Sequence, residues 1–263
     1  MAFKTTRREA LLGLTLGSVA LMTAGASVAA QTTSPMLDLV PQDAADLRQL
    51  SAQLAKAPRR RDFKTVPMIL TRPGEWDNEA LSLILAYRGG RRQAFDNTDL
   101  AGPWLNLMRN SMNAQVWSWK HPNFLCVSAT HGSAHLALYD DMIWNKYQFS
   151  KITDGKFETN RLAKDQPAAS ADAHAFQNED GVFSPADNTI VALQRRGAVF
   201  IACHNEVWEI TAARIKAGVN PDGLSHEAMA AEFTNHLIPG IVLSPGAIGT
   251  LPELQASGFS YAK

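Results

Sequence analysis

The chain has little cysteine and no excess of charge of either sign. It holds two cysteines, Cys126 and Cys203, and 25 basic against 25 acidic residues in a length of 263. Two cysteines are too few for a disulfide scaffold, and without a Cys-x-x-Cys motif a dithiol redox cycle within one chain is excluded. With balanced charge and no basic patch, nucleic acid is not an expected partner.

The signatures of several enzyme classes are missing as well. No Gly-x-Gly-x-x-Gly follows a strand pattern, and no Gly-Lys-Ser phosphate loop occurs, so dinucleotide or nucleotide binding is not expected. No Gly-x-Ser-x-Gly elbow occurs, which argues against an α/β hydrolase. The sequence therefore indicates no cofactor.

The first thirty residues are typical of an export signal. Lys4, Arg7 and Arg8 form a basic start, and residues 11–30 form an uncharged apolar run rich in small side chains. The run ends in Ser27-Val-Ala-Ala30, which suits signal peptidase. We therefore expect residues 1–30 to be a signal peptide.

The pair Arg7-Arg8 resembles a twin-arginine signal, although Ala10 stands where that signal usually has phenylalanine. We expect export to the periplasm by this route and cleavage after Ala29 or Ala30, with no permanent membrane span afterwards. An uncleaved anchor stays the alternative, because the run is long enough to cross a bilayer. Without residues 1–30 the formal charge is −2, since three basic residues and one acidic residue leave.

About 230 residues then remain, enough for one α/β domain with elaborations. Residues 31–65 are expected to be an N-terminal helical extension, with leucines 47, 50 and 54 forming a stripe. Residues 66–263 are expected to be the main domain, interrupted at about 150–187 by an exposed, mobile inserted loop. The run Arg59-Arg60-Arg61 is interpreted as a solvated turn.

Apolar strand patterns alternate with helical patterns along the main domain. This alternation predicts a three-layer α/β/α Rossmann-like sandwich around a mostly parallel sheet of about five strands. The expected strands are 66–71, 123–129, 198–203, 238–244 and 259–262; the expected helices, including one in the extension, are 43–57, 79–87, 104–112, 132–147, 188–196, 206–217, 225–236 and 247–257.

Cys203 closes the apolar run that begins at Ala198, and a helical pattern starts directly after it. A helix N-terminus stabilises a thiolate, so this placement predicts a reactive Cys203 with a depressed pKa. The alternative is an inert buried cysteine. Cys126 lies mid-strand and is interpreted as a buried thiol. The stagger between the two strands puts the cysteines on the order of 15 Å apart, too far for a disulfide.

Ligands of parallel α/β sheets bind beyond the carboxyl ends of the strands. The predicted strand ends bring Arg72, His131 and the pair Cys203-His204 to this edge. Arg72, His131, His204 and Asn205 are therefore the candidate ligand-binding residues, and Asn205 is also a candidate helix cap.

Two further sets of residues carry weaker signals. His131 and His135 are four residues apart, but no third ligand is in view, so no metal is expected. Trp104, Trp117, Trp119 and Trp144 are expected to pack in the core, and a ligand-lining role is the alternative.

Three segments carry a family resemblance: Leu193–Asn205, Gly240–Gly249 and Leu254–Tyr261. They resemble the DsrE-like family, as does Ala129-Thr-His-Gly132, and the likeness spans about 66–263. The resemblance implies a Rossmann-like sandwich and a protein that carries sulfur as a persulfide on the cysteine matching Cys203. The export signal, the N-terminal helix and the insertion depart from the sulfur carriers.

Two functions follow from these observations. The first is a periplasmic sulfur or thiol carrier that uses Cys203 with a donor or acceptor protein. The second is a non-catalytic exported domain that binds a small ligand or assembles into a homo-oligomer.

Overall fold

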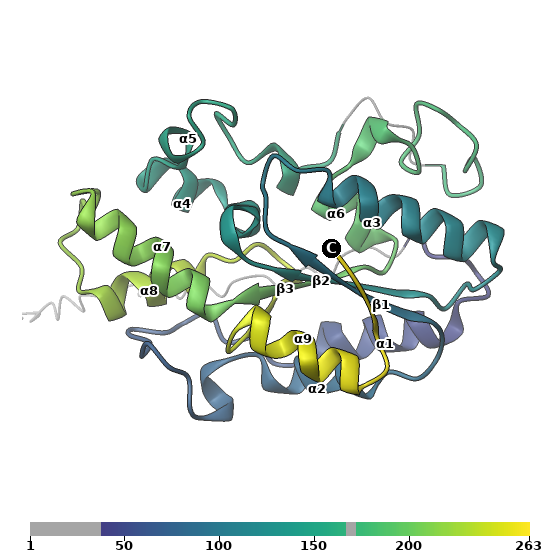
Figure 1. Cartoon of the computed structure of the whole chain (residues 1–263), viewed down its shortest axis with the longest axis horizontal. Coiled ribbons are helices and arrows are strands. Elements are labelled where there is room, and N and C mark those ends of the chain that lie inside the picture. Colours follow the sequence, from purple (N-terminus) through teal and green to yellow (C-terminus); the bar gives the residue numbers. More distant parts are fainter. Residues whose placement is uncertain (1–37, 167–171) are drawn as a thin grey trace, which may run out of the picture. The chain divides into compact units, whose positions relative to one another are not determined.

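The computed structural model describes residues 38–166 and 172–263, which fold around a five-stranded sheet (Figure 1). The expected signal peptide lies outside the described residues. Every neighbouring pair of strands is parallel, in the order β4-β3-β2-β1-β5. The strands are β1 (Arg92–Asn97), β2 (Leu125–Thr130), β3 (Val199–Cys203), β4 (Val242–Ser244) and β5 (Ser260–Ala262).

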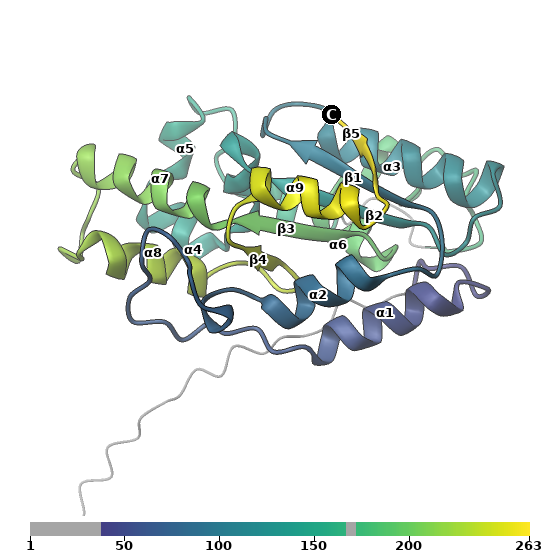
Figure 2. The same cartoon turned by 60° about the horizontal axis from the view of Figure 1, so that its bottom comes forward.

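Helices cover both faces of the sheet (Figure 2), so the predicted three-layer α/β/α sandwich is confirmed. On one face lie α1 (Ala45–Lys56), α2 (Asn78–Ala86) and α9 (Ala247–Ala256). The other face packs against α3 (Trp104–Asn113), α4 (Asp141–Lys146), α5 (Phe149–Ile152), α6 (Ile190–Arg195), α7 (His204–Lys216) and α8 (His226–Asn235). None of the described helices is long and apolar enough to cross a membrane.

The central strand β3 shows why this sequence forms a buried sheet. Val199 and Ile201 join the apolar cluster of α1, α2 and α9, while Phe200 and Ala202 join the cluster on the other face. All of β3 is buried. A strand covered on both faces needs apolar side chains at every position rather than at alternate ones.

The predicted strand over 66–71 is wrong, because this segment is irregular and the first strand is β1. Pro67 has no N–H for a ladder bond, and its carbonyl instead accepts a hydrogen bond from His204 Nε2 at 2.8 Å. β1 escaped detection because four of its six residues are polar, including Arg92 and Asn97.

The arginine run is not the solvated turn predicted from the sequence. Arg61 forms a buried bidentate ion pair with Asp77, at 3.1 and 2.8 Å. Arg59 Nε donates to the carbonyl of Ile241 at 3.2 Å, and Asp77 Oδ2 accepts from the N–H of Leu243 at 2.7 Å. The run therefore ties the N-terminal extension to the start of β4. Arg60, by contrast, forms an exposed ion pair with Asp62.

The insertion at about 150–187 is packed at both ends, so its predicted exposure is wrong there. Near its start, Asn160 is buried and donates to the carbonyls of Ala137 and Tyr139 at 2.8 and 2.7 Å. Near its end, Phe183 is buried and its ring meets that of Trp117 edge-on. Residues 167–171 lie outside the described part. The sequence did not predict this packing, because buried residues such as Phe183 are isolated in a polar segment.

Candidate functional sites

Four strands end together at one edge of the sheet, which we call the carboxyl edge. β1 ends at Asn97, β2 at Thr130, β3 at Cys203 and β4 at Ser244. In Figure 1, β3 runs to the left and α7 continues from its end. This edge is where sequence reasoning expected a ligand.

Cys203 sits between the N-termini of two helices. Its Sγ accepts a hydrogen bond from the N–H of Ala247, the first residue of α9, at 3.2 Å. The amides of Asn205 and Glu206, in the first turn of α7, also interact favourably with the thiolate form. This part of the prediction, a thiol at helix N-termini, agrees with the structure.

The predicted depression of the Cys203 pKa is wrong in direction. Burial raises the pKa of this thiol above its ordinary value, and the Glu206 carboxylate adds to the rise. The three amides lower the pKa but do not offset the lost hydration, since the side chain is only 4% exposed. In this conformation Cys203 is a neutral thiol at neutral pH.

His131 binds a carboxylate at the same edge. Its Nε2 lies 2.7 Å from Asp96 Oδ1, and the hydroxyl of Tyr261 donates to Asp96 Oδ2 at 2.8 Å. Burial alone would raise the pKa of Asp96, but hydrogen bonds from His131 and Tyr261 outweigh it and hold the pKa below the usual value. Asp96 is thus an ionised anchor for His131, directly after β2, and for Tyr261 in β5.

His135 reaches Cys203, a contact that the sequence did not indicate. The Nε2 of His135 accepts a hydrogen bond from the Cys203 N–H at 3.0 Å, which requires a neutral imidazole. Burial, together with the smaller effects of the nearby His131 and His204, lowers the pKa of His135 to about 3. Within the described ranges, no three metal-ligating side chains come together.

The other predicted site residues have structural partners. His204 is buried, burial lowers its pKa, and its bond to Pro67 anchors the irregular 66–71 segment. Asn205 lies inside α7 and is not its cap, because the helix begins at His204, two residues earlier than predicted. Arg72 is not at a strand end, because that strand does not form; its side chain is 80% exposed and pairs with Glu75.

A cavity of about 770 Å³ opens at the opposite end of the sheet, which we call the amino edge. Three stretches of chain line it, before β1, between α3 and β2, and before β5. Its lining residues are Arg88, Gly89, Gly90, Arg91, Arg92, Gln93, Gln115, Trp119, Lys120, His121, Pro122, Asn123, Phe124, Gly258 and Ser260. The lining therefore holds three arginines, one lysine and no carboxylate among the described residues.

The guanidinium of Arg92 forms part of the cavity wall. It donates through Nη1 to the carbonyl of Tyr87, while its buried Nε has no hydrogen-bond partner. Burial lowers the pKa of Arg92, and the neighbouring charge of Arg88 lowers it further. A Cβ on Gly258 would stand 2.6 Å from Arg92 Nη2, so glycine at this position leaves room for the guanidinium.

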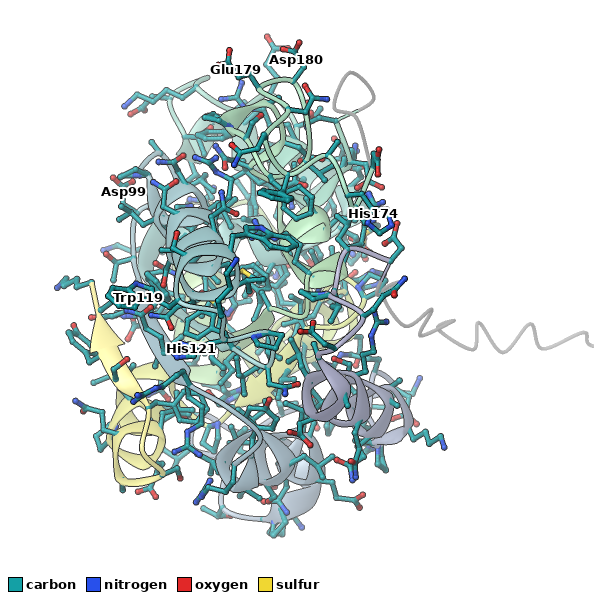
Figure 3. The ribbon with its side chains drawn as sticks, turned by 90° about the vertical axis from the view of Figure 1, so that its right-hand side faces the viewer. Asp99, Trp119, His121, His174, Glu179 and Asp180 are labelled. Carbon is teal, nitrogen blue, oxygen red and sulfur yellow. The ribbon has the colours of Figure 1, made fainter. Side chains whose placement is uncertain are left out.

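Trp119 stands at the mouth of the cavity with 67% of its surface exposed, against the prediction that it packs in the core. A π-helical turn, Ala114–Ser118, leads into it, and Lys120 follows with φ 57°. Figure 3 turns the amino edge toward the viewer and labels Trp119 and His121 there. Trp104 and Trp144, by contrast, are buried as predicted.

This cavity was not predicted from the sequence, because ligand sites of parallel sheets are expected at the carboxyl ends of strands and the cavity lies at the amino ends. The available signal was the cluster Arg88-Gly-Gly-Arg-Arg92 directly before a strand, with Trp119-Lys-His121 before the next.

Comparison with known proteins gives the chain no relative to reason from. No protein-family model matches it, and no curated protein and no solved structure was found to be similar.

Proposed function

We propose that the chain is a non-catalytic small-ligand-binding domain of the periplasm, and that its ligand occupies the amino-edge cavity. The observation that carries the proposal is the cavity itself. Its volume of about 770 Å³ falls within the range of small-molecule sites, roughly 300–1,000 Å³. Its lining combines the aromatic side chain of Trp119 with several polar and charged groups that could fix the orientation of a ligand.

The state of Cys203 favours this function over sulfur carriage. A carrier cysteine must meet its partner's sulfur and react as the thiolate. Cys203 is 4% exposed and burial raises its pKa. At the same carboxyl edge, the polar side chains of His131 and Glu206 already have partners in Asp96 and in the Gly132 N–H.

The experiment is recovery of the mature chain from the periplasm, followed by native mass spectrometry and a thermal-shift screen of small metabolites. A bound compound stabilises the fold in proportion to its occupancy. Ser260→Trp places a bulky ring in the lining, and Ala256→Trp places one on the exposed end of α9 outside it. Binding that is lost in Ser260→Trp and kept in Ala256→Trp supports the proposal. If no compound co-purifies and none shifts the melting temperature, the proposal is wrong.

One observation favours a second function, the thiol carrier. Three backbone amides, from Asn205, Glu206 and Ala247, converge on Cys203 Sγ and stabilise negative charge there. Opening of the edge would let the Cys203 thiolate attack the outer sulfur of a donor persulfide, with the donor leaving as its thiolate. This function, and the resemblance to the DsrE-like family that implies it, predicts an additional 32 Da on Cys203 in protein purified without reductant.

A further inference from the structure

We propose that the amino-edge cavity binds a small organic anion that carries a planar ring. This inference rests on the proposed function and names the chemistry of its ligand. It is carried by two features of the cavity: an excess of positive charge and an exposed aromatic surface beside it.

Positive charge in the cavity is not neutralised by the protein. Arg88 and Arg92 donate to backbone carbonyls, and in the described part of the chain no carboxylate forms an ion pair with Arg88, Arg91, Arg92 or Lys120. The nearest acid is Asp46, which lies against Gly89 and Tyr87 outside the lining. Four cations against one acid give the site a net attraction for anions.

The cations also repel one another. The charge of Arg88 contributes to the lowered pKa of the partly buried Arg92. A bound carboxylate, sulfate or phosphate would relieve this repulsion. Its oxygens are also strong acceptors for charge-assisted hydrogen bonds from Arg91 and Lys120 in the lining.

Trp119 supplies the surface for a planar group. Its ring is largely exposed although it lies beside the basic lining residues Lys120 and His121. Lys120 holds a left-handed conformation that is uncommon for a residue other than glycine, and such strain is often found at binding sites. Stacking on an exposed indole depends little on the identity of the ring.

A tryptophan among basic residues is also typical of proteins that bind anionic membranes. The recessed volume of about 770 Å³ favours a soluble ligand instead, because a bilayer surface presents headgroups to an exposed face rather than filling a cavity. We therefore infer that the ligand is a soluble small molecule. Binding to membranes through this site would contradict the proposal.

The test compares three probes by equilibrium dialysis against the mature chain: phenyl phosphate, inorganic phosphate and phenol. Phenyl phosphate has both features, and each of the others has one. We expect phenyl phosphate to bind at least roughly tenfold more tightly than either, and added salt to weaken it. Binding should also quench the fluorescence of Trp119. This quenching should be absent in Trp119→Phe.

Matched variants separate the contributions. The double variant Arg91→Gln, Lys120→Gln should bind phenyl phosphate roughly tenfold more weakly, because charge-assisted hydrogen bonds are lost. Lys64→Gln with Lys151→Gln removes the same charge at exposed positions outside the lining and should leave binding unchanged. Trp119→Ala should remove the advantage of phenyl phosphate over inorganic phosphate, and Trp119→Phe should keep most of it.

Two outcomes overturn the inference and leave the proposed function standing. In the first, neutral compounds bind in a manner that Ser260→Trp abolishes, while phenyl phosphate does not bind at ~10 mM. In the second, both charge variants bind phenyl phosphate equally well. If phenyl phosphate fails to bind and the chain instead sediments with phosphatidylglycerol vesicles through Trp119, the inference and the proposed function both fail.

Discussion

The side chains of Cys126 and Cys203 lie on opposite faces of the same sheet. Cys126 belongs to the apolar cluster under α3, and Cys203 belongs to the cluster under α1, α2 and α9. The register also separates them along the sheet, because Ala202 is opposite Thr130 and Cys203 is therefore five residue steps beyond Cys126. Their separation along the strands and their location on opposite faces of the sheet together exclude a disulfide between these two free thiols.

The difference between the two sites predicts their reactivity. Burial raises the pKa of both thiols, but Cys126 is wholly enclosed, while Cys203 has three amides that favour its thiolate. In the folded chain we expect iodoacetamide to label neither cysteine at pH 7, and to label Cys203 first as the pH rises above ~9. Peptide mass spectrometry measures this. Labelling of Cys203 at pH 6 would instead favour the thiol carrier.

The neutral His135 predicts a loss of stability in acid. Its pKa is about 3 when folded and 6.5 ordinarily, so the unfolded chain binds the extra proton first as the pH falls. The stabilising effect is therefore complete above pH 6.5 and is lost progressively between pH 6.5 and 3.

Urea unfolding at a series of pH values tests whether the free energy of unfolding falls as the pH is lowered. His135→Gln keeps a hydrogen-bond acceptor and removes the titration, so the dependence on pH should become shallower by up to ~1.4 kcal/mol per pH unit between pH 6 and 4. His174→Gln, at an exposed position, should leave the dependence unchanged. Equal slopes in His135→Gln and the parent chain would show that the imidazole is not kept neutral.

The buried pair Arg61–Asp77 predicts that the N-terminal extension is essential for stability. Asp77→Ala leaves the buried charge of Arg61 without its carboxylate and the Leu243 N–H without its acceptor, and should lower the free energy of unfolding by about 3–5 kcal/mol. Arg60→Met breaks the neighbouring exposed pair with Asp62 and should cost below ~1 kcal/mol. Denaturant unfolding compares the two variants. Similar losses in the free energy of unfolding would contradict a stabilising role for the buried Arg61–Asp77 pair.

The sequence was sufficient for the fold class because burial on both faces of a parallel sheet leaves a strong pattern, as in Ala198–Cys203. It failed where polar chemistry decides the structure. β1 carries Asp96 and Asn97, whose side chains have partners distant in sequence, His131 and Ser128. Periodicity contains no information about those partners, so neither the strand nor the amino-edge cavity next to it could be predicted.

At the carboxyl edge the sequence located Cys203 and His131 but not their electrostatics. Helix N-termini can be predicted from the pattern around Cys203, whereas the amount of water removed depends on packing by segments far away in the chain. The raised pKa of Cys203 and the neutral His135 are both consequences of that packing.

The anchoring of the insertion by Asn160 predicts its resistance to proteolysis. Asn160→Ala leaves two buried carbonyls, of Ala137 and Tyr139, without their donor, which should cost about 1–3 kcal/mol. Most of that loss should appear as local opening, so limited proteolysis at residues 150–166 should become faster than in the parent chain. Glu158→Ala, at an exposed position nearby, is the control. Unchanged cleavage in Asn160→Ala would mean that other contacts hold the segment.

The pair Arg7-Arg8 predicts that the chain is exported from the cytoplasm by the twin-arginine route. Replacing both arginines with lysine keeps the positive charge and removes the guanidinium pair, so precursor should accumulate in the cytoplasm. Lys4→Gln lowers the charge but keeps the pair, and should still be exported. Cell fractionation with intact-mass measurement reports both location and cleavage near Ala30. If the double lysine variant reaches the periplasm as efficiently as the parent, twin-arginine export is wrong, and a general secretory route becomes the explanation for the apolar run.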